Sequence, residues 1–174
     1  VALPDDATVT EAGEAASRLI ASAQSERMSI LTGDDDRFPK RLRGIPDAPV
    51  VLFAKGQVDV LNRAECLAIV GTRHPTPYGT EVATRVGRHA AERGFVVASG
   101  LAEGIDAAAH KGCLSARGAT VAVLAHGLDR IYPANHEDLA HEIVESGGCL
   151  VSEYPPTTGV RRNQFVERNR LQSG

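Results

Sequence analysis

The chain has 174 residues, of which 43% are hydrophobic and 24% charged, and both shares are ordinary for a soluble globular protein. This length predicts one domain with a small N-terminal appendage. No apolar run approaches the ~20 residues of a membrane span and no signal peptide is visible, so we expect a cytoplasmic protein without membrane contact. The net charge of −3 argues against an indiscriminate nucleic-acid binder.

Charge is distributed unevenly along the chain. Residues 1–36 hold eight acidic and two basic residues, a balance of −6, whereas residues 160–170 hold four arginines and one acid, a balance of +3. Such asymmetry is compatible with a local anion-binding face on a mildly acidic body. From charge alone, an ordinary solvated surface is an equally good interpretation.

The three cysteines, Cys66, Cys113 and Cys149, are odd in number and widely spaced. We predict them to be small buried hydrophobes in a reducing cytosol. The stretch HEDLAH (136–141) places its two histidines one residue too far apart for a zinc-binding helix motif. Neither a dinucleotide-binding glycine fingerprint nor a phosphate-binding loop motif is present, so we predict no metal and no cofactor.

Hydrophobic periodicity predicts the elements in chain order. The N-terminal part begins with an amphipathic helix over 8–27 and continues with short strands at 28–31 and 49–56. From residue 66, short apolar runs alternate with helical patterns. We predict buried strands at 66–71, 95–99, 120–125 and 149–154, and helices at 78–94, 103–118 and 135–148, the last capped by Asn135.

Strands that alternate with helices predict parallel βαβ units and therefore an α/β, doubly wound, mainly parallel sheet. We interpret residues 1–65 as an N-terminal helix and extension leading into the sheet, and residues 66–174 as the core.

Glycine-bearing turns follow the predicted strands at the edge where ligands bind in open α/β sheets. The Ser99-Gly100 turn leads into an Ala-rich helix, whose N-terminus offers unpaired N–H groups to an anion. Arg73, just past the first core strand, adds a planar cation suited to phosphate oxygens. The alternative is that these glycines only make tight turns. We interpret His110 as a packing residue rather than a general base, and Asp106 as a partner of the helix dipole.

The C-terminal segment brackets Phe165 with four arginines. Cations that follow phosphates, with a ring that stacks on a base, are typical of single-stranded nucleic-acid binding. The alternative is a charged helix start with Phe165 in the core.

Five blocks together carry a family likeness: AIVGTRHPTPYG, VASGLAEGIDAAAHKG, GLDRIYPANHEDLA, LVSEYPP and FVERNRLQSG. In this order they resemble the DprA/Smf family of DNA-processing proteins, and the likeness covers about residues 28–174. The family usually continues past the last block with another strand and helix, which this sequence lacks.

The resemblance implies a Rossmann-like domain that binds and protects single-stranded DNA and helps to load a RecA-type recombinase, in natural transformation or DNA repair. It implies binding rather than catalysis. It also implies a homodimer, although the missing continuation leaves dimerisation and recombinase contact open. The implied DNA contacts are Gly71, Thr72, Arg73, Ser99, Gly100, Leu101, Gly127, Arg162, Phe165, Arg168, Asn169 and Arg170.

Two other functions stay open from the sequence. One is a nucleotide-binding sensor or nucleoside-monophosphate phosphoribohydrolase of the same fold superfamily. This chain lacks the PGGxGTxxE block of those enzymes, but Glu103 and Glu153 are available acids. The other is a protein-interaction module.

Overall fold

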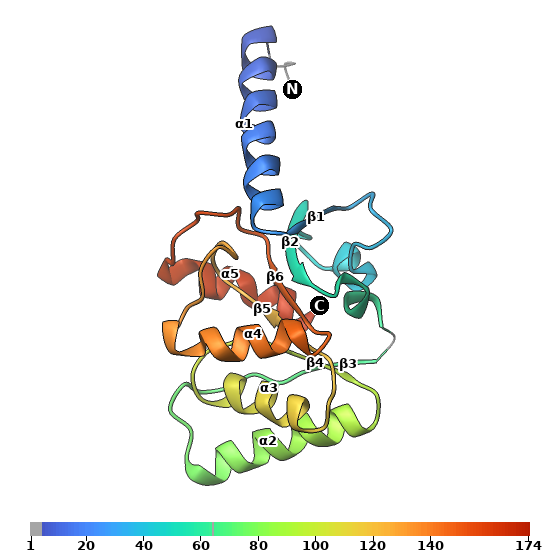
Figure 1. Ribbon diagram of the computed structural model, residues 1–174, viewed down its shortest axis with the longest axis vertical. Helices are drawn as coiled ribbons and strands as arrows, with labels where there is room; N and C mark the ends of the chain where they lie inside the picture. The colour runs from blue at the N-terminus through green and yellow to red at the C-terminus, as the bar shows by residue number, and fades with distance from the viewer. Residues whose placement is uncertain (1–4, 64) are drawn as a thin grey trace.

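A six-stranded sheet in the order β1-β2-β6-β5-β4-β3 forms the centre of the protein in a computed structural model that describes residues 5–63 and 65–174 (Figure 1). Strands β3 to β6 pair in parallel, while β2 pairs antiparallel with both β1 and β6. The strand bounds are β1 (Ser29–Thr32), β2 (Val51–Gly56), β3 (Cys66–Ala68), β4 (Val96–Ser99), β5 (Thr120–Val123) and β6 (Cys149–Ser152).

Helices cover both faces of this sheet. Three of them link successive parallel strands, and right-handed crossovers along the order β3-β4-β5-β6 place all three on the same face. They are α2 (Pro77–Glu92), α3 (Ile105–Ser115) and α4 (Glu137–Glu145), the last preceded by the 3₁₀ turn η3 (Ala134–His136). The other face carries α5 (Arg162–Ser173) and the 3₁₀ turns η1 (Lys40–Gly44) and η2 (Val58–Asn62). The predicted Rossmann-like, mainly parallel α/β fold is confirmed.

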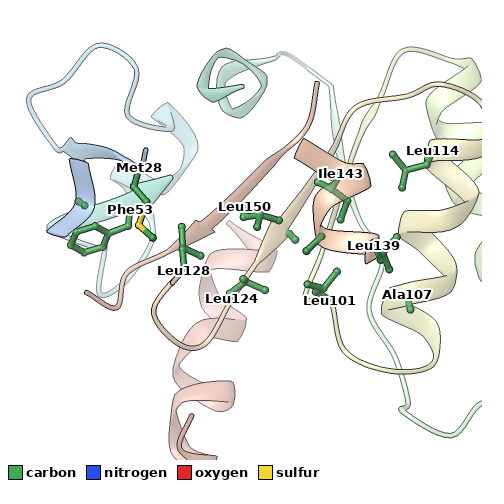
Figure 2. Packing of buried hydrophobic residues seen from close by; sticks show 13 residues of the cluster. Met28, Phe53, Leu101, Ala107, Leu114, Leu124, Leu128, Leu139, Ile143 and Leu150 are labelled. Atoms are coloured by element: carbon green, nitrogen blue, oxygen red, sulfur yellow. The ribbon is translucent and has the colours of Figure 1, made fainter. Parts of the chain in front are cut away.

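The core lies on both sides of the sheet because successive strand residues point to opposite faces. Figure 2 shows Leu124 and Leu150 in one cluster with Leu139 and Ile143 of α4. On the opposite face, alternate residues of β5 and β6 pack against Leu171 of α5. Strands buried on both faces explain the continuous apolar runs of the sequence.

The prediction that residues 66–71 form a strand buried on both faces is wrong in part. Strand β3 covers only Cys66–Ala68, and all three residues are exposed. The reason is its place at the sheet edge, where it pairs with β4 alone within the described ranges. Cys66 is therefore exposed, whereas Cys113 and Cys149 are buried as predicted.

The N-terminal part contributes one protruding helix and two strands of the sheet. Helix α1 (Asp6–Ser25) extends away from the rest of the molecule, and Ala23 is its buried residue (Figure 1). Residues 1–4 and 64 of the predicted segment 1–65 lie outside the described ranges. Among the described residues, no helix has both the length and the hydropathy that a membrane span requires.

Candidate nucleic-acid interface

A hollow of about 600 Å³ lies beside the carboxyl end of β3, between the chain that follows β3, the start of α3 and one side of α5. Its lining comes from segments far apart in the sequence, because the parallel strands bring their following loops to one edge of the sheet. The predicted residues that the structure brings to this hollow are Gly71, Arg73, Phe165, Arg168, Asn169 and Arg170.

The turn that carries Arg73 is held against the start of α3. The Ile105 N–H donates a hydrogen bond to the Thr72 carbonyl at 3.2 Å. Gly104 adopts φ +81°, and a Cβ at this position would overlap the same carbonyl oxygen, so only glycine permits this approach. The turn therefore presents Arg73 from a fixed backbone.

Arg73 points its guanidinium group at an aromatic ring. The guanidinium carbon lies 5.0 Å from the centroid of Phe165, a cation–π geometry. Arg73 is exposed and forms no ion pair with any described residue. Its charge is thus oriented by the ring and still available to an anion.

Phe165 lies at the surface and not in the core. It is half-buried on α5, and its centroid is 6.0 Å from that of Tyr132 with the planes tilted by 58°. Such a tilted pair is favourable for aromatic rings. Tyr132, which sequence reasoning missed, comes from the loop after β5 and is 44% exposed. Its only sequence signal is an aromatic residue before a proline within a turn-rich segment.

The Ser99-Gly100-Leu101 turn is buried, and its polar groups already have partners. The Ser99 hydroxyl donates to the Ile69 carbonyl at 2.6 Å. The Gly100 N–H donates to Oδ2 of Asp106 at 3.0 Å, and the Leu101 carbonyl lies 2.8 Å from Nδ1 of His136. The Asp106 carboxylate therefore occupies the position at which we predicted an external phosphate to bind. Direct DNA contact by these three residues stays a prediction.

Arg168 is buried, with 4% of its surface exposed. Its Nη1 donates to the Gly100 carbonyl at 3.2 Å and also to the Val123 carbonyl. Burial lowers the pKa of Arg168 and raises the pKa of the nearby Asp106 carboxyl, while the attraction between the two charges opposes both shifts. Arg168 thus fastens α5 to the ends of β4 and β5.

Arg170 is also engaged within the protein. Its guanidinium forms a two-pronged ion pair with Glu153, at 3.0 Å and 2.5 Å, and Nε donates to the Asp47 carbonyl at 2.9 Å. The Glu153 hydrogen bonds raise the pKa of Arg170. Arg170 therefore connects α5 to the segment after β6 and to the loop before β2.

Three further predicted residues, Arg162, Asn169 and Gly127, differ in how exposed they are. Arg162 begins α5 and is exposed, and the exposed Asn169 side-chain amide has no hydrogen-bond partner among the described residues. Gly127 is buried under the chain at Pro155, and its N–H donates to the Thr158 carbonyl at 3.0 Å. Gly127 does not line the hollow.

The prediction that Asn135 caps the last core helix is wrong. Helix α4 begins at Glu137 after the 3₁₀ turn η3, which places His136 at the N-cap position. The Asn135 side chain instead donates through Nδ2 to Oε1 of Glu103 at 3.2 Å.

These features define a Rossmann-like α/β protein with exposed cations and aromatic rings beyond its strand ends. The chain matches the family described as DNA recombination-mediator protein A over residues 29–174. It therefore belongs to this family, which is the DprA/Smf family that the five sequence blocks resemble.

Two curated relatives show the extent of the likeness. The chain is 36% identical to DNA processing protein DprA of Bacillus subtilis over 157 residues, which cover 90% of this chain and 52% of the relative. It is 43% identical to a putative DNA processing protein DprA of Mycobacterium tuberculosis over 156 residues, 82% of this chain and 39% of the relative. The chain thus spans about half or less of these relatives.

Two solved structures share the fold. DNA processing protein A of Streptococcus pneumoniae has a TM-score of 0.76 at 36% identity, covering 84% of this chain and 50% of its own. DNA processing protein A of Helicobacter pylori, for which a single-stranded DNA binding mode is described, has a TM-score of 0.71 at 32% identity, covering 83% and 63%.

Proposed function

We propose that this protein binds single-stranded DNA in the cytoplasm, protects it, and helps to load a RecA-type recombinase during natural transformation or DNA repair. The observation that carries the proposal is the exposed Arg73 guanidinium stacked on Phe165 beside the strand-end hollow. Family membership and the single-stranded DNA binding mode of the Helicobacter pylori protein support it.

The proposed mechanism is positional and electrostatic rather than catalytic. Arg73 and Arg162 hold successive phosphates, Asn169 donates to the backbone, and Phe165 supplies a ring against which a base stacks. Arg168 and Arg170 act behind this surface: they fix α5 and thereby the position of Phe165. Phosphate contacts carry no base information, so binding is broadly tolerant of sequence.

A titration tests the proposal. A labelled oligo-dT of about 20 nucleotides and a duplex of equal length are titrated at low and high salt. We expect tighter binding to the single strand and an affinity that falls steeply with salt, because bound cations displace counterions. Arg73→Ala should weaken binding about tenfold on every sequence, since it removes one charge-assisted phosphate contact.

The matched control is Arg18→Ala, which removes the same charge from the protruding α1 and should leave binding unchanged (Figure 1). If Arg73→Ala and Arg162→Ala both bind like the parent protein, the proposed surface is wrong. Release of free base from nucleoside monophosphates would instead favour the phosphoribohydrolase alternative. In that reaction Glu103 is the more accessible acid, because Arg170 already pairs with Glu153.

The recombinase part of the proposal needs its own measurement. On single strands coated with a single-stranded DNA-binding protein, the parent protein should shorten the lag before the DNA-dependent ATPase activity of the recombinase, and Arg73→Ala should not. An unchanged lag with normal DNA binding contradicts recombinase loading alone. We also propose the homodimer that the family resemblance implies, and light scattering measures it separately.

A further inference from the structure

Asp106 is a buried acid in the lining of the strand-end hollow, and the binding mechanism above gives it no role. It lies in the first turn of α3 and is only 4% exposed. A buried carboxylate is costly unless hydrogen bonds or an opposite charge replace the water that it has lost. The groups that compensate Asp106 therefore show which parts of the protein depend on it.

Backbone N–H groups from two strand-end turns converge on this carboxylate. Gly100, in the turn after β4, donates to Oδ2 of Asp106 at 3.0 Å. Burial raises the pKa of Asp106, and hydrogen bonds from the N–H groups of Gly71 and Ala102 are among the contacts that oppose this rise. Gly71 belongs to the turn after β3, so one carboxylate joins the turns of two neighbouring strands.

The turn after β3 carries Arg73 only two residues beyond Gly71. Strand β3 pairs with β4 alone within the described ranges, so this turn has no strand on its outer side. It is held against the first turn of α3 instead. The Ile105 N–H donates to the Thr72 carbonyl, and a Cβ on Gly71 would overlap the Ile105 side chain. The hydrogen bond from Gly71 to Asp106 is the second attachment of the turn to α3.

Arg168 supplies the opposite charge that favours an ionised Asp106. The attraction between the two charges opposes the rise in the pKa of Asp106 that burial causes. Arg168 is itself held by the carbonyls of Gly100 and Val123. Helix α5 therefore keeps its attachment to the sheet when Asp106 is changed, whereas the turn after β3 loses one of its two attachments to α3.

We propose that Asp106 is a positioning residue that holds the Arg73 turn in place for a phosphate, a proposal that rests on the proposed single-stranded DNA binding. The carboxylate would repel a phosphate, so its contribution comes from the backbone that it holds and not from contact with DNA. Asp106→Asn keeps the shape of the side chain but turns an amide donor toward backbone donors. This variant should therefore release the turn.

A double-mutant cycle tests the proposal with oligo-dT as the probe. Asp106→Asn and Arg73→Ala should each weaken binding about tenfold, because each loses the same phosphate contact. The double variant should also bind about tenfold more weakly than the parent, and not about a hundredfold as independent losses would give. Each single variant should lower the slope of log affinity against log salt concentration by about 0.7, which corresponds to one phosphate.

Thr120→Val controls for stability that is lost elsewhere. It removes a buried hydroxyl at the amino end of β5, outside the lining of the hollow. This variant should melt at a lower temperature than the parent and bind oligo-dT with the parent's affinity. Circular dichroism gives the melting temperatures, and binding is compared at a temperature at which every variant is folded.

Chemical rescue separates the role of the carboxylate from a general role in packing. Asp106→Ala removes the carboxylate and leaves its N–H donors without an acceptor. Sodium formate in place of sodium chloride, at constant ionic strength, should restore part of the affinity of this variant, because formate supplies the missing carboxylate oxygens. Thr120→Val should not respond to formate. A lack of response by Asp106→Ala would contradict the proposed role of the hydrogen bonds.

Hydrogen exchange tests the same contacts in the parent protein without a substitution. Gly71 is exposed and lies outside the helices and strand ladders, so its amide should exchange rapidly unless the Asp106 carboxylate accepts its hydrogen bond. We expect slow exchange at Gly71. Rapid exchange there would overturn the proposal even if every Asp106 variant failed to fold.

The outcomes separate this role from the proposed function. Tighter binding by Asp106→Asn would show that the carboxylate only repels DNA, and unchanged binding would show that the Arg73 turn does not need it. Additive losses in the double variant would show that Asp106 does not act through Arg73. Each of these results overturns the positioning role while single-stranded DNA binding stands. If the parent binds no oligo-dT, the proposed function itself fails.

Discussion

His110 lies fully buried on α3, where its side chain takes part in a buried hydrogen-bond network. Its Nδ1 is 2.8 Å from the Thr120 hydroxyl oxygen, and that hydroxyl donates to the Val97 carbonyl at 2.6 Å. Because the hydroxyl hydrogen is committed, Nδ1 carries a proton and donates it. Nε2 is buried without a hydrogen-bond partner, so a second proton there is unfavourable and the imidazole is neutral. Burial, with a smaller contribution from His136, lowers the pKa of His110 to about 3. The interpretation of His110 as a packing residue agrees with this geometry.

The lowered pKa of His110 predicts that the free energy of unfolding depends on pH. The unfolded chain takes up a proton at the ordinary pKa near 6.5, whereas the folded chain takes it up only near 3, so stability is lost as the pH falls through this window. Between about pH 7 and pH 5 the parent should lose roughly 2 kcal/mol more than His110→Asn, which keeps a donor but does not titrate. Urea unfolding at both pH values measures the difference.

The comparison uses the change with pH and not the stability at one pH, so a constant cost of the substitution cancels. Parallel pH profiles for the parent protein and His110→Asn would contradict a buried neutral imidazole.

Among elements, α2 and α3 pack closely because small residues line their interface. A Cβ on Gly87 of α2 would overlap the Ala109 carbonyl, and a Cβ on Gly112 of α3 would overlap the Thr84 carbonyl. The Ala-rich composition of α3 follows from this approach, since larger side chains would separate the two backbones.

Gly112→Ala should therefore destabilise the protein by about 2 kcal/mol, because the added methyl group forces the two helices apart. Thermal unfolding followed by circular dichroism measures the loss. The control is Gly13→Ala on α1, where a Cβ has no neighbour within 4 Å and alanine favours the helix. Equal melting temperatures for the two variants would show that the interface tolerates a larger residue.

In the whole molecule, the sheet with its covering helices forms one body from which α1 extends (Figure 1). Ala23 is the buried residue of α1, and apolar residues such as Val9 and Ile20 are exposed. With so few tertiary contacts, the outer part of α1 should open locally at little cost in free energy.

Limited digestion with trypsin should therefore cut first after Arg18, whose side chain is 68% exposed. The remaining fragment should stay resistant and melt at the parent temperature, because the cut lies before Ala23. Mass spectrometry identifies the cut, and Arg18→Gln should remove it. A first cut within the sheet-forming part would contradict the independence of α1.

The sequence by itself determined the order and type of the elements, because the repeat of apolar residues that distinguishes a helix from a strand is local. It also determined the family, through blocks that keep their order. The α/β fold could thus be predicted almost entirely, as could the neighbourhood of the candidate site.

Only the tertiary structure decided which of the predicted arginines are free to bind an anion. Arg168 and Arg170 look alike in the sequence, yet one is buried against Gly100 and Val123 and the other pairs with Glu153. These three partners lie between 17 and 68 residues away along the chain, so no local pattern records them. The tertiary structure also decided three other features. It placed β3 at the sheet edge, put the Asp106 carboxylate at the predicted phosphate position, and brought Tyr132 into contact with Phe165. Each depends on which segments folding brings together.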